Sequence, residues 1–308
     1  MTQRTVSVLI AARNAEETIA LAVHSALAQT AHLHEVIVVD DASTDRTLDV
    51  LYAIDDPRLR VLRQPNCQGP GVARNRAMEA ATGQWMTILD ADDAYHLQRL
   101  ERLFAAYPND GERTILGDHW MLCLSRNVAL VPWKMGENFP FCIDLYDFLI
   151  YKPFLVQPLF PSRVRDLGIR YPAYFAAEDA IFMCRMLAQG YLLRLHPDPL
   201  YFYRLRNGSL SHDLSGIKAT EVAFTALLEE LDPVLNEKSR RAVEDIINTA
   251  IKDSHYLPVL EALRHKRYGK AARQIFADRF CRTEFLRRLY PSVLKRLRVL
   301  RFPDTTGR

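Results

Sequence analysis

The stretch EVIVVDDASTD, residues 35–45, decides the fold. Its first part, Glu35–Val39, is a mostly apolar run that predicts a buried strand, and this strand closes on the carboxylates of Asp40 and Asp41. The Ala-Ser-Thr-Asp that follows supplies side chains able to cap a helix, which we expect over Thr44–Ile54. The stretch therefore predicts a buried strand, a turn with two acidic side chains, and a helix.

Similar units lie on both sides of this stretch. Apolar runs alternate with segments whose apolar positions recur at helical spacing, which is the pattern of a parallel sheet with crossover helices. We therefore expect an α/β fold with a Rossmann-like, mostly parallel sheet flanked by helices. Ligands bind beyond the carboxyl ends of such strands, so the acidic groups at Asp40-Asp41 and Asp90–Asp93 should face one crevice. Further strands are predicted at Val6–Ala12, Leu59–Arg63, Trp85–Leu89 and Pro199–Tyr203, and helices at Glu16–Gln29, Gly71–Thr82, Leu97–Tyr107 and Glu178–Gln189.

Composition excludes several classes of protein. The apolar share of 49% and the charged share of 25% are those of a globular protein. The five cysteines are scattered and form no CxxC pair, so neither a disulfide framework nor a cysteine-rich zinc site is indicated. The apolar run near the N-terminus is shorter than a signal peptide or a membrane span requires. We therefore expect a cytoplasmic protein.

The organisation of the chain changes near Ser215. From there on apolar positions follow helical spacing, so we expect residues 1–214 to form the α/β domain and residues 215–308 a helical C-terminal region. The segment Arg264–Arg301 holds thirteen lysines and arginines against two acidic residues, whereas the whole chain carries a net charge of +3. Charge is therefore concentrated at the end of the chain.

Within this basic segment, Glu284–Leu300 places apolar residues on one stripe and basic residues off it. A basic amphipathic helix of this kind fits an anionic membrane surface, which would make the protein peripheral to the inner face of the cell membrane. The alternatives are an ordinary helix packed on the α/β domain and a contact in a homodimer. No nucleic-acid recognition module is visible, so we expect no nucleic-acid partner.

The acidic group Asp90-Ala-Asp92-Asp93 follows a predicted strand directly. Carboxylate oxygens are hard ligands that suit Mn²⁺ or Mg²⁺, and such ions are held by one or two carboxylates together with substrate phosphates. The alternative is a solvated acidic turn before the next helix. His212 comes at a place from which a further metal ligand could reach the site, although a lone histidine is more often structural.

Two basic motifs suit phosphate. Gln68–Asn75 combines a glycine-containing loop, a helix start and the cation of Arg74, which is a setting for phosphate oxygens. Arg204 and Arg206 follow a predicted strand, and a guanidinium there suits a departing diphosphate, with simple exposure to solvent as the alternative.

The pair Glu178-Asp179 opens a predicted helix. Adjacent residues on a helix point in different directions, so one carboxylate can act as a general base while the other anchors the loop or a basic partner. The alternative is an acidic pair that complements the helix dipole. Trp120 and Trp133 could form a platform for a sugar ring, but core packing is the better reading of both.

Taken in order, these motifs resemble the family 2 glycosyltransferases over residues 5 to 213. Any one of them could arise by chance, but their order along the chain is specific. The motifs are Val-Leu-Ile-Ala-Ala-Arg13-Asn14, Val-Val-Asp40-Asp41-Ala-Ser-Thr-Asp45, Gly69-Pro-Gly71-Val-Ala-Arg74-Asn75, Asp90-Ala-Asp92-Asp93, Glu178-Asp179, and Tyr203-Arg204-x-Arg206-x-Gly-Ser209-Leu-Ser211.

The resemblance implies a GT-A fold, with residues 1–95 as the nucleotide-binding half and residues 96–214 as the acceptor-binding half. It implies that the Ala11–Asn14 turn and Asp41 hold the base and ribose. Asp90 would lie near the ribose and the metal, Asp92 would be the main protein ligand to the metal, and Asp179 would be the general base. Asp40 and Arg74 belong to the same nucleotide-binding set. Arg13 departs from the family pattern, which often has an aromatic residue there to stack on the base.

The activity implied is an inverting transfer of a sugar from a nucleotide diphosphate donor, preferably a UDP-sugar, to a hydroxyl of a saccharide or lipid-linked saccharide. Bacterial surface polysaccharide or exopolysaccharide assembly is the setting that the resemblance implies. One alternative is a nucleotidyltransferase, although the turn Ala11–Asn14 lacks the glycine-rich signature with a lysine which that class carries. The other is a non-catalytic nucleotide-sugar-binding protein.

Overall fold

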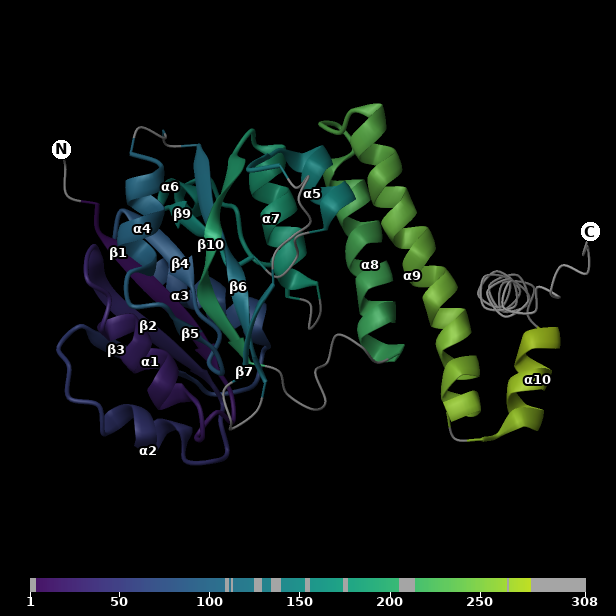
Figure 1. Ribbon diagram of the computed structural model, residues 1–308, viewed down its shortest axis with the longest axis horizontal. Coiled ribbons are helices and arrows are strands. Elements are labelled where there is room, and N and C mark those ends of the chain that lie inside the picture. Colours follow the sequence, from purple (N-terminus) through teal and green to yellow (C-terminus); the bar gives the residue numbers. More distant parts are fainter. Residues whose placement is uncertain are drawn as a thin grey trace, which may run out of the picture.

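A computed structural model describes residues 4–108, 111, 113–124, 129–133, 140–152, 156–173, 177–204, 214–264 and 266–277. Figure 1 shows an α/β body that is followed, toward the C-terminus, by a helical arm.

One ten-stranded sheet runs through the α/β body in the order β3-β2-β1-β4-β9-β6-β10-β5, with β7 paired to β6 and β8 to β10. Strands β1 to β4 pair in parallel, and so do β6 and β10, whereas β9 runs antiparallel to its neighbours β4 and β6. The expected α/β fold class is confirmed. The strands are β1 Val6–Ala12, β2 Leu33–Asp41, β3 Leu59–Gln64, β4 Trp85–Ile88, β5 Ala94–Tyr95, β6 Thr114–Leu124, β7 Ala129–Trp133, β8 Cys142–Ile143, β9 Leu159–Pro161 and β10 Leu192–Arg204.

Helices cover both faces of the central parallel strands, which explains the largely apolar runs in β1 and β2. Along β1, Val8 and Ile10 pack in the cluster that contains helix α1 (Ile19–Leu27), whereas Leu9 packs in the cluster that contains α3 (Pro70–Ala80). The other helices of the body are α2 Thr47–Tyr52, α4 Arg99–Ala106, α5 Leu145–Tyr151, α6 Arg163–Asp166 and α7 Glu178–Ala188.

The first two helices begin later than the sequence predicts. Helix α1 was expected from Glu16 and α2 from Thr44. The backbone N–H of Glu16 instead donates to Asp45 Oδ2 (3.1 Å), and Asp45 Oδ1 accepts from the backbone N–H of Thr47 (3.0 Å). Because Asp45 binds backbone donors of both segments, it ties the β1–α1 loop to the β2–α2 loop and precedes helix α2 rather than lying inside it.

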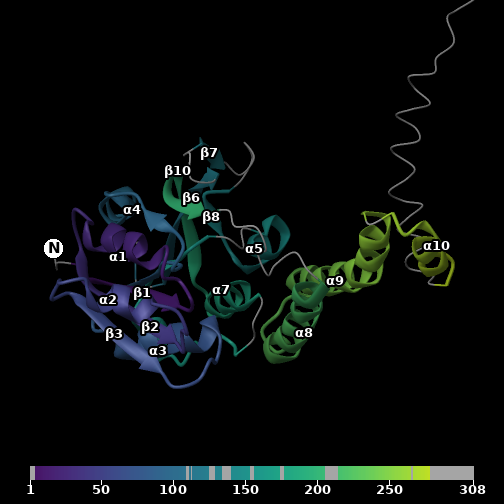
Figure 2. The same ribbon diagram turned by 90° about the horizontal axis from the view of Figure 1, so that it is seen from below.

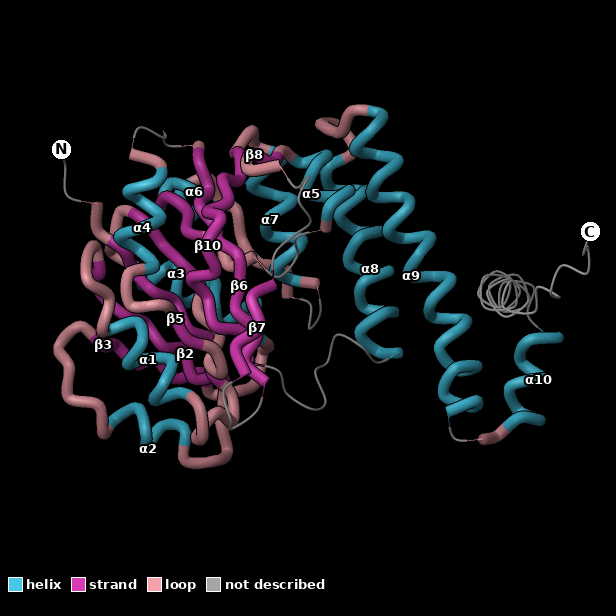
Figure 3. The backbone as a smooth tube through the Cα atoms, in the orientation of Figure 1, coloured by secondary structure: helices cyan, strands magenta, loops and turns pink. Residues whose placement is uncertain are grey.

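The helical arm consists of α8 (Leu214–Leu231), α9 (Glu237–Arg264) and α10 (Tyr268–Ala277). Figure 2 shows α8 beside α7 and α9 against α8, with α10 at the end remote from the sheet. Figure 3 shows that the described residues after β10 form helices and the turns between them. No helix among the described residues is long and apolar enough to cross a membrane. The predicted basic amphipathic helix, Glu284–Leu300, lies outside the described residues.

Candidate functional site

Predicted site residues from three turns lie at the carboxyl edge of the parallel strands. Strand β1 lies between β2 and β4, and its last residue, Ala12, pairs with Asp40. Asp90 follows the end of β4 by two residues. The turns after these three strands therefore lie next to one another, as the sequence predicts.

The turns after β1 and β2 hold each other in an uncommon backbone conformation. Asn14 and Ala42 are both left-handed, with φ of 49° and 56°. The side chain of Asn14 accepts a hydrogen bond from the backbone N–H of Thr44 (2.9 Å), and its backbone N–H donates to Ser43 Oγ (3.0 Å). Left-handed non-glycine residues cost free energy and concentrate at functional sites, so these turns are candidates for ligand contact.

Asp41 is buried and binds the loop that leads to α3. Its Oδ1 accepts from Gln64 Nε2 (2.7 Å) and from the backbone N–H of Gln68 (2.8 Å), and its Oδ2 accepts from the backbone N–H of Gly69 (2.8 Å). The predicted contact of Asp41 with a base stays a prediction, because the described contacts of its carboxylate are made to the end of β3 and to this loop.

Asp40 lies beside Asp41 and is fully buried. Its Oδ2 accepts from the backbone N–H of Ser43 (3.3 Å), and its Oδ1 has no hydrogen-bond partner among the described residues. Arg13, in the turn after the half-buried Ala11, donates through Nη1 to Cys67 Sγ. Arg13 and Cys67 therefore bring the β1 turn and the β3–α3 loop together.

Arg74 is the centre of the site. Its Nη1 lies 2.9 Å from Glu178 Oε1 and 2.9 Å from Asp179 Oδ1, and its Nη2 lies 2.7 Å from Asp90 Oδ1. The side chain of Arg74 is only 5% exposed, so one buried guanidinium holds three carboxylates. The described partners of Arg74 are these carboxylates, and the predicted contact of Arg74 with phosphate stays a prediction.

The motif around Arg74 explains how α3 reaches this position. A Cβ at Gly71 would lie 2.3 Å from the carbonyl oxygen of Pro172, so only glycine allows α3 to approach that segment. Asn75 fixes the same contact, because its Nδ2 donates to the carbonyl oxygen of Tyr171 and its Oδ1 accepts from the N–H of Tyr171, both at 2.8 Å. The Tyr171 ring lies under the guanidinium of Arg74 at 5.4 Å.

The electrostatics of the site raise the pKa of Asp179 to about 8. Burial is the largest cause, the charge of Arg74 opposes it, and the neighbouring carboxylates of Glu178 and Asp90 raise the pKa further. A carboxylate that exchanges its proton near neutral pH is suited to general base catalysis.

The acidic loop after β4 is held by the end of β10. Asp93 accepts from Tyr201 Oη and from the backbone N–H of Arg204, both at 2.8 Å, and Arg204 Nε donates to the carbonyl oxygen of Asp92 (2.9 Å). Burial raises the pKa of Asp93 to about 8, and the charges of Asp90 and Asp92 add to this effect. Arg204 therefore lies against the acidic loop, whereas Arg206 and His212 lie outside the described residues.

The chain is similar to known glycosyltransferases over much of its length. The family model described as "Glycosyl transferase family 2" matches residues 7–126. Glycosyltransferase GlyG of Streptococcus pneumoniae is 30% identical over 228 residues, which cover 67% of this chain and 72% of GlyG. The chain belongs to the family 2 glycosyltransferases. The family predicted from the order of the motifs is thus confirmed.

The matches to other relatives of this glycosyltransferase cover different shares of the two chains. The succinoglycan biosynthesis protein ExoO of Rhizobium meliloti is 29% identical over 310 residues, covering 96% of this chain and 86% of ExoO. The glucosyltransferase WfaP of Escherichia coli is 38% identical over 113 residues, but these cover only 34% of this chain and 45% of WfaP. The crystal structure of S. aureus TarS with UDP-GlcNAc superposes with a TM-score of 0.61 at 20% identity, covering 87% of this chain and 89% of that one, which shows a shared fold.

The donor atoms after β4 of this glycosyltransferase suit a hard divalent cation. No group of three or more His, Cys, Asp or Glu in the described part of the chain has an arrangement that would hold a metal. Burial is the largest cause of the raised pKa of Asp93, and the charges of Asp90 and Asp92 add to it. Carboxylate oxygens are the ligands that Mn²⁺ and Mg²⁺ prefer, and such ions are commonly held by one or two carboxylates together with substrate phosphates, so the role of Asp92 as a metal ligand stays a prediction.

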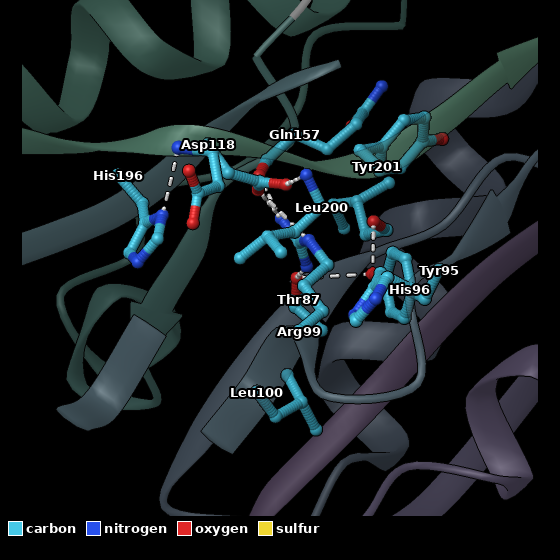
Figure 4. A network of polar contacts seen from close by, with 12 residues as sticks. Thr87, Tyr95, His96, Arg99, Leu100, Asp118, Gln157, His196, Leu200 and Tyr201 are labelled. Carbon is cyan, nitrogen blue, oxygen red and sulfur yellow. Dashed lines mark hydrogen bonds and ion pairs between the residues drawn. The ribbon is translucent and has the colours of Figure 1, made fainter. Parts of the chain in front are cut away.

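A polar network behind the site was not predicted from the sequence. Arg99 is fully buried and donates to Asp118 through Nε and Nη2 (2.9 and 2.7 Å), to Thr87 Oγ1, and to the carbonyl oxygen of Gln157. Figure 4 shows the guanidinium of Arg99 among these acceptors. Gln157 Nε2 in turn donates to Asp90 Oδ2 (3.0 Å), so the network supports the site. The partners are far apart in the sequence, and no local pattern connects them.

Trp120 packs in the core, which is the role that the sequence favours over a sugar-binding platform. Its side chain is 7% exposed and lies in the α1 cluster, with its ring 5.6 Å from the ring of Tyr203. The side chain of Trp133 lies outside the described residues.

Proposed function

We propose that this enzyme transfers a sugar, with inversion, from a UDP-sugar to a hydroxyl of a saccharide or lipid-linked saccharide, and that Asp179 is the general base. The observation that carries the proposal is the contact of Arg74 with both Asp90 and Asp179. Asp90 comes from the strand edge where the donor would bind, and Asp179 lies in the first turn of α7. One guanidinium thus holds a donor-side carboxylate close to a candidate base.

The two adjacent carboxylates have different surroundings. The Glu178 side chain is 12% exposed and hydrogen-bonds to Arg74, whereas the Asp179 side chain is 29% exposed and makes an ion pair that lacks hydrogen-bond geometry. Asp179 is therefore the more accessible of the two and keeps acceptor capacity for an incoming proton. We assign the base to Asp179 and the anchoring role to Glu178.

The step needs one base. The acceptor hydroxyl oxygen attacks the anomeric carbon in line with the bond to the diphosphate, its proton passes to the Asp179 carboxylate, and the diphosphate leaves with the electron pair of the broken bond. Because a single displacement inverts the anomeric carbon, no carboxylate nucleophile is required. Arg204 would pair with the departing diphosphate, and its contact with the acidic loop supports this role.

A divalent cation, when bound by Asp92 and by the predicted ligand His212, would supply charge to neutralise the departing diphosphate. The Ala11–Asn14 turn, Asp40 and Asp41 would hold the base and ribose.

The names of the relatives support the proposed UDP-sugar donor and the proposed saccharide or lipid-linked acceptor. TarS was crystallised with UDP and with UDP-GlcNAc, and WfaP is named as a glucosyltransferase from UDP-Glc to a diphosphoundecaprenol-linked sugar. ExoO is named as a succinoglycan biosynthesis protein. These names favour a UDP-sugar, a sugar or lipid-linked acceptor, and a role in bacterial polysaccharide assembly.

The test measures release of nucleoside diphosphate from UDP-, GDP- and dTDP-sugars by the wild type, Asp179→Asn and Glu178→Gln, with Mn²⁺ or Mg²⁺ present. We expect release of UDP, a product of inverted anomeric configuration by ¹H NMR, and loss of transfer in Asp179→Asn with nucleotide binding retained. If Glu178→Gln lost transfer while Asp179→Asn kept it, the two roles would be exchanged. Formation of UTP and a sugar 1-phosphate from the UDP-sugar when pyrophosphate is added would instead indicate a nucleotidyltransferase.

A further inference from the structure

Tyr171 joins the helix that carries Arg74 to the helix that carries the proposed base. The guanidinium carbon of Arg74, on α3, lies 5.4 Å from the centre of the Tyr171 ring. The same ring stacks on the ring of Phe182 in α7, with ring centres 3.9 Å apart and an angle of 17° between the planes. Phe182 comes three residues after Asp179, so the two side chains are neighbours on one side of α7. One ring therefore contacts both the cation and the helix of the base.

The position of the Tyr171 ring is fixed from several directions. Asn75, next to Arg74 on α3, binds both the carbonyl oxygen and the N–H of Tyr171 at 2.8 Å. Phe182 is fully buried and packs edge-on against Phe160, with ring centres 5.3 Å apart. The whole of Tyr171 is 3% exposed. Because close-packed interiors leave side chains little room to move, the ring is a rigid support.

The guanidinium of Arg74 depends on such a support. Its Nη atoms bind carboxylates, whereas its Nε has no hydrogen-bond partner among the described residues. Asp179 in turn meets Arg74 in an ion pair of 2.9 Å that lacks hydrogen-bond geometry. The position of the guanidinium relative to Asp179 is therefore sensitive to what packs against it, and the face of an aromatic ring attracts a guanidinium.

The hydroxyl of Tyr171 is not suited to proton transfer. It is buried and has no hydrogen-bond partner in the part of the chain that the structure describes. Burial raises the pKa of Tyr171 well above its usual value, the charge of Asp179 raises it further, and the charge of Arg74 opposes both. The side chain therefore stays a neutral phenol and acts through the face of its ring. The effect of Asp179 on this pKa also indicates that the ring lies close to the base.

We propose that Tyr171 is a positioning residue for sugar transfer, whose ring holds the guanidinium of Arg74 against the Asp179 carboxylate. This inference rests on the proposed function, in which Asp179 is the base. Among the described residues, the charged groups that act on Asp179 are Arg74 from α3, Glu178 from α7 itself and Asp90 from the loop after β4. Arg74 is the cation of these three. A guanidinium that moves away leaves the two acidic neighbours unopposed, so the pKa of Asp179 rises.

The test measures UDP release from a UDP-sugar, with acceptor, against pH for the wild type, Tyr171→Phe and Tyr171→Met. Methionine is apolar and adapts to the space that it is given, but it has no ring face. We expect Tyr171→Met to lower kcat about tenfold, which is the effect of one cation–π contact in a desolvated site, and to move the acid limb of the pH–rate profile to higher pH. Tyr171→Phe keeps the ring and loses only the unpaired hydroxyl, so it should keep kcat within about twofold of the wild type and should keep its acid limb.

Two controls separate positioning from loss of stability. Tyr191→Met is the matched control, because Tyr191 is 1% exposed, belongs to the same core cluster and lies beyond the other end of α7. It should lower the melting temperature, as Tyr171→Met does, but keep the wild-type acid limb. A ring-fluorinated phenylalanine in place of Tyr171 keeps the shape of phenylalanine and draws electron density away from the ring face, so it serves even if Tyr171→Met does not fold. Its kcat should be about threefold below that of Tyr171→Phe.

A folded Tyr171→Met protein with the kcat and the acid limb of the wild type would overturn the inference. Equal kcat of the fluorinated protein and Tyr171→Phe would overturn it too. A wild type that releases no UDP, or near-native transfer by Asp179→Asn, would instead refute the proposed function on which the inference rests.

Discussion

Replacing Arg74 by glutamine tests the centre of the site. The change leaves Asp90, Glu178 and Asp179 without their common counter-ion. Removing one partner of a buried ion pair costs about 3–5 kcal/mol. Because the side chains of Asp90 and Asp179 are 26% and 29% exposed, water can partly replace the guanidinium, and we expect the lower end, about 3 kcal/mol. At about 2–4 °C per kcal/mol, the melting temperature should fall by roughly 6–12 °C.

The same change should move the pH dependence of the reaction. The charge of Arg74 opposes the burial that raises the pKa of Asp179 to about 8, so without Arg74 this pKa rises further. A base works only when deprotonated, so the rate falls as pH drops through its pKa. The acid limb of the pH–rate profile should therefore shift to higher pH in Arg74→Gln.

The matched control is Arg76→Gln, on the same helix two residues further on. Arg76 Nη1 donates to the carbonyl oxygen of Arg63 at 2.7 Å in an exposed contact, so its loss should cost little. The assay is thermal unfolding followed by UDP release between pH 6 and 10. The reasoning would be refuted if Arg74→Gln had the same melting temperature as Arg76→Gln and if its pH–rate profile kept the acid limb of the wild type.

Three other changes should have distinct effects. Asp92→Asn should abolish sugar transfer and leave the melting temperature within about 2 °C, since Asp92 is the proposed ligand to the cation, and full turnover in excess EDTA would contradict the metal role. Asp118→Asn should lower the free energy of unfolding by about 3–5 kcal/mol, because it leaves the buried Arg99 without a counter-ion. Denaturant unfolding measures this change, and a loss below about 1 kcal/mol would show that the ion pair does not stabilise the fold. Ending the chain near Phe276 should abolish salt-sensitive flotation with anionic liposomes, whereas equal flotation of both chains would favour a packing or dimer role for the basic segment.

The parallel half of the sheet could be predicted because burial on both faces makes the central strands β1 and β2 largely apolar. Val6–Ala12 was predicted with its observed bounds. Strand β9 could not be predicted, since Leu159–Pro161 is short and its antiparallel direction depends on distant partners. Strand β10 is longer than the predicted Pro199–Tyr203, because register shifts at His196 and Pro199 interrupt its pattern.

The site was predicted as a set of motifs rather than as a set of contacts. The carboxylates after the strands have a local signal in the sequence, and so does the pair that opens α7. The contact of Arg74 with Glu178 joins residues 104 positions apart, so only folding reveals it. Gln157 was missed for the same reason, because a lone glutamine before a short strand carries no periodic signal.

The most direct test of the central claim is the rate of UDP release from a UDP-sugar, with acceptor, measured against pH for the wild type and Asp179→Asn. The wild-type rate should rise with pH through about 8, where Asp179 loses its proton. Asp179→Asn should be slower by about 10²–10⁴-fold and should lack this rise. A near-native rate with the same pH dependence in Asp179→Asn would contradict the assignment of Asp179 as the general base.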